Sequence, residues 1–123
     1  MKITKQLKKL IEENALALAS VDEKGNPHNI ALGYVKVIEG NKILISVNYI
    51  VFTLKYIKKN PNVSLVVWNK NWKKNCIGYE LLGKAKFYSK GKYSEIIKKL
   101  PINKGEPCRG AIIVSINKIK NLS

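Results

Sequence analysis

The sequence has few residues of the kinds that build common catalytic and metal sites. His28 is its only histidine, and Cys76 and Cys108 are its only cysteines. A single histidine excludes a multi-histidine metal site, and we expect His28, beside a turn, to be a surface residue. The cysteines form no CxxC motif and are expected to be structural thiols.

Common catalytic motifs are also missing. The chain has no GxGxxG, no Walker loop and no GxSxG, and its eight carboxylates form no obvious acid–base pair. We therefore expect that any chemistry depends on a bound cofactor rather than on side chains alone.

Long hydrophobic runs are absent as well. No apolar run approaches the roughly 20 residues of a membrane span. The opening MKITKQLKKLIEEN has two glutamates where a signal peptide needs an apolar stretch. It predicts an amphipathic helix with Ile3, Leu7, Leu10 and Ile11 on one side. We expect a cytoplasmic protein without a membrane-spanning segment.

Negative charge is scarce: 8 acidic residues face 23 basic ones, for a net charge of +15. Such a charge is typical of nucleic-acid-binding proteins. However, Arg109 is the only arginine, and readers of bases and phosphates favour arginine. The lysines are scattered along the chain and form no long run. This pattern favours a solvated lysine-rich surface, as in thermophilic proteins, over nucleic-acid binding.

The 123 residues predict one domain, residues 1–123, with an ordinary globular composition. The residue pattern predicts six strands, at 15–21, 29–37, 42–47, 63–68, 77–89 and 110–119, and a late helix at 93–100. The nearly continuous apolar run at 63–68 is typical of a strand that is covered on both sides. Six strands with mostly hairpin connections indicate a closed or nearly closed barrel.

One short helix interrupts the strands within SVNYIVFTLKYIKKNPNVSLVVW, residues 46–68. We expect Pro61 to end this helix, and Leu54 and Ile57 to pack it on the barrel. A helix start that follows a strand is a ready anion site, because its first N–H groups are free. Thr53 and Asn48 offer polar groups there, but both are explained equally well as helix caps.

The same segment resembles the FMN-binding split-barrel family related to pyridoxamine 5'-phosphate oxidase. The likeness is carried by KILISV, by the helix that ends in Asn60-Pro61, and by Val-Ser-Leu at 63–65. ALALASVDEKGNPHNI resembles that family's first hairpin, and GYELLGKAKFYSKGKYSEII its fifth strand and last helix, so residues 7–119 are covered. The resemblance implies a mainly β fold, a six-stranded antiparallel split β-barrel with a few short helices. It also implies a homodimer with FMN at the subunit interface.

The resemblance further implies which residues bind FMN. The phosphate is expected beside the third strand and the following helix, and the flavin ring along the second and third strands. The residues implied are Asn29, Ile30, Ala31, Ser46, Val47, Asn48, Phe52, Thr53 and Lys55. Thr53 matches a phosphate-binding threonine, whereas Phe52 stands where many relatives have a basic ligand. Lys55 or a lysine of the partner subunit is the candidate replacement, and without either we expect weak FMN binding or a different ligand.

The predicted function is an FMN-binding flavoprotein, an oxidoreductase or electron-transfer protein supplied by a nicotinamide cofactor or a redox protein. VSINKIKNLS at the C-terminus lacks the Arg and His that hold pyridoxal phosphate in true oxidases, so vitamin B6 oxidation is not expected. One alternative is a split barrel that has lost FMN and binds another ligand or serves as an interaction module. The second is a basic nucleic-acid-binding module. Trp68 and Trp72 are candidate dimer-interface residues, and core packing is the alternative for Trp68.

Overall fold

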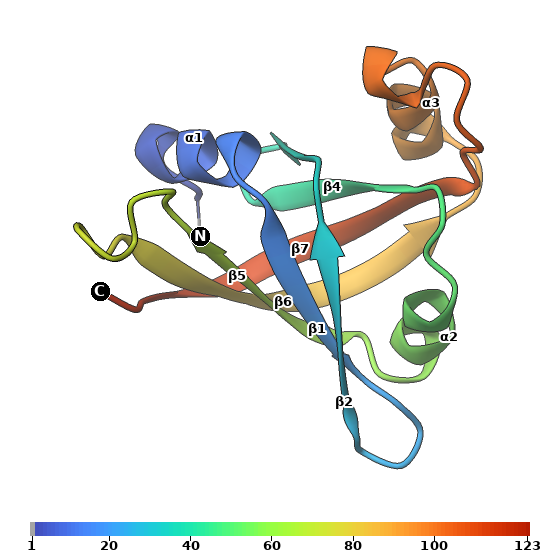
Figure 1. The fold of residues 1–123 in the computed structure, drawn as a ribbon. Helices are drawn as coiled ribbons and strands as arrows, with labels where there is room; N and C mark the ends of the chain where they lie inside the picture. The colour runs from blue at the N-terminus through green and yellow to red at the C-terminus, as the bar shows by residue number, and fades with distance from the viewer. Residues whose placement is uncertain (1) are drawn as a thin grey trace.

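Seven antiparallel strands form one curled sheet in the order β2-β1-β5-β6-β7-β4-β3 (Figure 1). This computed structural model describes residues 2–123. The strands are β1 Leu16–Val21, β2 Pro27–Leu32, β3 Val35–Ile38, β4 Lys42–Val47, β5 Asn62–Trp68, β6 Gly78–Tyr88 and β7 Gly110–Asn121. The helices are α1 Lys5–Glu13, α2 Phe52–Lys59, α3 Lys92–Lys98 and a 3₁₀ turn at Pro101–Asn103. The predicted mainly β split-barrel architecture is confirmed.

The sheet has seven strands rather than the predicted six, because residues 29–37 do not form one strand. The chain bends at Gly33 and Tyr34 and separates β2 from β3. β2 then pairs with β1 at one edge of the sheet, while β3 pairs with β4 at the opposite edge. Because the two consecutive strands end on opposite edges, the sheet must curl to bring these edges toward each other.

The main core fills the inside of the curl. Strands β1 and β5 each bury alternate side chains there, among them Leu16, Leu18 and Leu65. The other face of β5 is only half-buried, so the expectation of a strand covered on both sides was wrong for the single chain. Alternation of one buried and one open face is typical of antiparallel sheets.

Helix α1 packs against β3 and β5. Thr4 caps it by accepting a hydrogen bond from the Leu7 backbone N–H at 3.2 Å. The predicted apolar side is confirmed, since Ile3, Leu7 and Ile11 are buried and Leu10 packs against the core. Among residues 2–123, no helix has the length and apolar character that crossing a membrane requires.

Helix α2 lies against β1 and β6, and α3 lies on β7 and β4 (Figure 1). Leu54 and Ile57 are buried in the main core, as predicted. The helix stops before Pro61, because Asn60 is already extended. At its other end, α2 begins at Phe52, only a few residues after β4 ends at Val47.

Candidate functional site

A cleft of about 670 Å³ lies between β2, the end of β4 and the start of α2. Residues 102–106 supply a further wall. Most of the lining is apolar, as in typical sites for small molecules and cofactors. The apolar residues are Ile30, Ala31, Leu32, Tyr34, Ile45, Ile50, Val51, Phe52 and Ile102.

A larger hollow of about 840 Å³ lies beside α1. Several of its polar side chains already have local roles: Thr4 caps α1 and Asn14 donates to the Leu10 carbonyl oxygen. None of the residues expected to bind a cofactor lies in it. The chemistry of the lining therefore favours the cleft at α2 as the functional site, despite its smaller volume.

The structure gathers six of the nine predicted cofactor-binding residues in the α2 cleft. They are Ile30, Ala31, Ser46, Asn48, Phe52 and Thr53. The other three lie elsewhere. Val47 is fully buried in the core, and Asn29 lines a separate hollow of about 350 Å³ on the outer face of the sheet. The Lys55 ammonium lies 3.1 Å from the Glu23 carboxylate, outside the cleft lining.

The first turn of α2 has polar groups without partners. Val51 occupies the N-cap position, and its side chain cannot accept a hydrogen bond from the first N–H groups. Thr53 lines the cleft and is fully buried, and its Oγ1 has no hydrogen-bond partner within residues 2–123. A buried hydroxyl is normally paired. The Thr53 hydroxyl therefore lacks an acceptor within the described part of the chain.

A hydrogen-bond network joins the end of β4 to the loop after α3. Asn103 is buried, and its Oδ1 is 3.1 Å from both the Ser46 hydroxyl and the Asn48 amide nitrogen. The Asn48 amide also donates to the Pro107 carbonyl oxygen at 2.7 Å. Asn48 thus anchors residues 103–107 across the cleft, whereas the sequence suggested a role in the turn before α2. Sequence reasoning missed Asn103, which lies 55 positions away.

Charge in the cleft is sparse. Glu106 is the only charged residue in its described lining, and its carboxylate accepts a hydrogen bond from the Tyr49 hydroxyl. This bond raises the pKa of Tyr49, since the carboxylate favours the protonated phenol. Arg109 lies beside the cleft, because its Nη1 donates to the carbonyl oxygen of the lining residue Ile50 at 3.1 Å. It steadies the connection between β4 and α2, and no motif in the sequence marks it.

Three aromatic rings meet at the β2–α2 side of the cleft. His28 stands edge-on to Tyr56 with centroids 5.2 Å apart, and to Phe52 at 6.4 Å. Phe52 and Tyr56 stack with an interplanar angle of 20°. His28 and Phe52 line the cleft, so the sequence's only histidine is a wall of the site rather than a simple surface residue.

The curled sheet and its cleft define a split-barrel protein, and comparison with known proteins narrows the class. A family model described as pyridoxamine 5'-phosphate oxidase matches residues 3–122. The chain therefore belongs to this family. It is 29% identical over 128 residues to the uncharacterized protein MJ0282 of Methanocaldococcus jannaschii, across 99% of this chain and 82% of the relative.

Solved structures share the fold. HupZ of Group A Streptococcus superposes with a TM-score of 0.84 at 24% identity, covering 98% of this chain and 94% of HupZ. An FMN-binding protein from Syntrophomonas wolfei gives a TM-score of 0.77 at 15% identity, covering 94% and 83% of the two chains. At these identities the likeness establishes the common fold.

Proposed function

We infer that the α2 cleft binds FMN and that the protein is a redox flavoprotein. The observation that carries this proposal is the buried Thr53 hydroxyl, which has no partner among the described residues. A phosphate group is an acceptor for this hydroxyl and for the free N–H groups of the first turn of α2. Family membership and the FMN-binding protein of the same fold point to the same class of ligand.

The rest of the cleft fits the flavin part of FMN. A buried isoalloxazine ring needs apolar walls and a few placed polar groups. Ile30, Leu32 and Ile45 offer the apolar walls, and Ser46 and Asn48 offer the polar groups. When bound, FMN supplies the electron-transfer chemistry, and the residues of this chain hold its phosphate and its ring.

The phosphate end of this site is built from neutral donors. Phe52 occupies the position expected to be basic, and the Glu23 carboxylate already pairs with Lys55. Charge-assisted hydrogen bonds are about twice as strong as neutral ones. We therefore expect FMN to bind through helix N–H groups and the Thr53 hydroxyl, with lower affinity than in a site that has a cation at this position.

A homodimer is part of the proposal. The outer face of the sheet carries small half-exposed residues, among them Ala17, Ala19 and Ser64, around the hollow that contains Asn29. Trp68 is 42% exposed beside this face, which argues against its role in the core of the single chain. A second copy would cover both features and bring Asn29 to the interface. Light scattering should give twice the 13.9 kDa mass of one chain.

The decisive experiment compares FMN with riboflavin, which lacks the phosphate. Purified protein is titrated with each flavin while flavin fluorescence is followed. We expect FMN to bind about tenfold or more tightly, the difference made by one charge-assisted hydrogen bond. Bleaching of the bound flavin by NADH or NADPH under anaerobic conditions then tests for a nicotinamide donor. Absence of FMN binding at tens of micromolar would overturn the proposal and favour a split barrel with another ligand.

A further inference from the structure

A groove of about 530 Å³ lies beside the C-terminal part of α2, whereas the cleft lies at the start of this helix. Four lysines from three different elements line it: Lys42 on β4, Lys58 on α2, and Lys84 and Lys86 on β6. No carboxylate is among its described lining residues. This groove is separate from the proposed flavin site, which has no lysine in its described lining.

The sheet register brings these lysines together. Lys42 pairs with Ser115 of β7, and Ser115 pairs with Lys84 of β6, so one row crosses three adjacent strands. Lys86, two positions after Lys84, points to the same face. The pairing of β5 with β6 ends at Lys84, so the later part of β6 has a free edge beside α2. Lys58 approaches from the last turn of α2.

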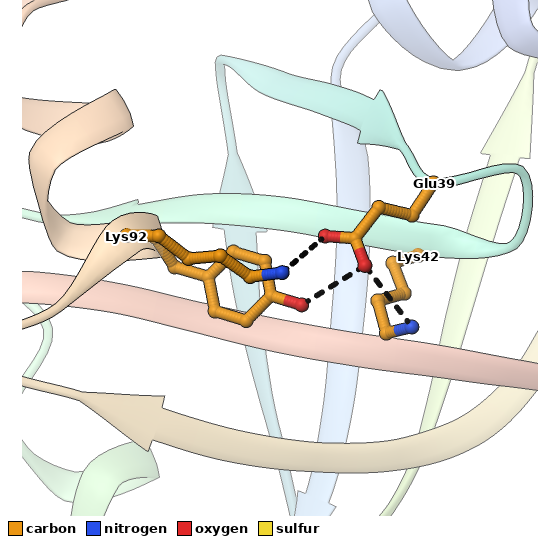
Figure 2. Close-up of polar contacts among 4 residues, drawn as sticks. Glu39, Lys42 and Lys92 are labelled. Carbon is orange, nitrogen blue, oxygen red and sulfur yellow. Dashed lines mark hydrogen bonds and ion pairs between the residues drawn. The ribbon is translucent and has the colours of Figure 1, made fainter.

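Most of this positive charge is not neutralised. Figure 2 shows the exception: the Glu39 carboxylate lies 3.6 Å from the ammonium groups of both Lys42 and Lys92. Lys58, Lys84 and Lys86 have no carboxylate within 4.0 Å in the described part of the chain. Lysines on a free strand edge also prevent edge-to-edge pairing. That role explains Lys86, but it does not explain why Lys42, Lys58 and Lys84 line the same groove.

Apolar side chains also line the groove: Ile57 and Phe87 on the core side of β6, and Ile113 on the same face as Lys86. Lysine ammonium groups bind phosphates as compact point charges. The volume is within the range of small-molecule sites. We propose that this groove binds a small molecule that carries two or more adjacent phosphate groups, with its apolar part against Ile57 and Phe87.

The shape favours such a ligand over a nucleic acid. Non-specific nucleic-acid binding uses an extended basic face that follows a phosphate backbone. Here the lysines surround one short concavity instead. A clustered oligophosphate can interact with several of these ammonium groups at once, whereas a single phosphate reaches fewer of them.

The test uses isothermal titration of the full chain with tripolyphosphate, ATP, AMP and inorganic phosphate at constant ionic strength. We expect tripolyphosphate and ATP to bind, and AMP and phosphate to bind at least about tenfold more weakly, since they lack adjacent charges. The variant Lys58→Gln/Lys84→Gln/Lys86→Gln should weaken ATP binding by about tenfold or more. Its FMN affinity should be unchanged, which separates this proposal from the flavin proposal.

The matched control is Lys5→Gln/Lys8→Gln/Lys9→Gln on α1, which removes the same charge from exposed positions. We expect it to leave ATP binding within about twofold, because exposed charges beyond a Debye length are largely screened. If both variants weaken ATP binding equally, the effect comes from net charge alone and the proposed binding site in the groove is wrong. Failure of tripolyphosphate and ATP to bind would also overturn it.

Discussion

Replacement of Thr53 by valine tests the proposed phosphate site most sharply, because it should change stability and binding in opposite directions. Valine keeps the shape of threonine and exchanges only the hydroxyl for a methyl group. In the free protein this hydroxyl is buried without a partner. Leaving such a group unsatisfied costs about 1–3 kcal/mol. Thr53→Val should therefore raise the free energy of unfolding of the ligand-free protein by up to about that amount.

In the complex with FMN, the same change removes a donor to a charged phosphate. The loss should again be about 1–3 kcal/mol, which corresponds to roughly a fivefold to 150-fold rise in Kd. Chemical denaturation measures the free energy of unfolding, and FMN titration measures the Kd. Thr53→Ser keeps the hydroxyl and serves as the control for binding, and riboflavin affinity should not respond to Thr53→Val. A valine variant that is less stable than the native protein and binds FMN equally well would refute the reasoning.

Three further predictions concern other parts of the molecule. At Gly83→Ala the new Cβ would lie 2.3 Å from the Ser115 carbonyl oxygen, so thermal or chemical unfolding should show a loss of about 1–3 kcal/mol, as for other overpacked sites. Asn103→Ala should cost about 1–3 kcal/mol and speed amide hydrogen exchange in residues 101–109, because it removes the acceptor shared by Ser46 and Asn48. The pKa of Glu39 is lowered below its ordinary value of 4.5, first by the Tyr93 hydroxyl and then by two lysines. The contribution of Glu39 to stability is therefore present above pH 4.5 and lost as the pH falls through its lower pKa in the folded protein. Glu39→Gln should destabilise the protein at neutral pH, and in acid its stability should approach that of the native protein.

Much of the fold follows from local signals in the sequence. Strand alternation, the glycine-containing turns and the stop at Asn60-Pro61 depend on neighbouring residues, and the sequence predicted these elements to within a few positions. The bend at Gly33 and Tyr34 was missed, because residues 29–37 look like one continuous strand. Only the pairing of β2 and β3 with partners at opposite edges separates them, and that pairing is a property of the whole sheet.

The site was predictable where its residues are close in sequence to the β4–α2 junction. Ser46, Asn48, Phe52 and Thr53 lie in the cleft for that reason. Asn103 and Glu106 come from a loop more than 50 residues away, with no motif to connect them. The family resemblance suggested Lys55 as a replacement phosphate ligand, but local sequence cannot reveal that Glu23 of the first hairpin pairs with its ammonium group. Long-range partners therefore decide the charge of the site.

The unpredicted bend and the cleft have the same structural origin. A continuous strand over residues 29–37 would place all of its side chains on one edge of the sheet. The bend instead leaves β2 at one edge and sends β3 to the other, so that β2 faces the end of β4 without pairing to it. Ile30 to Tyr34 line the cleft from one side, and Ile45, Ser46 and Asn48 contribute from the other. Since the backbone edges do not close on each other there, the split in the barrel is the place where the cleft opens.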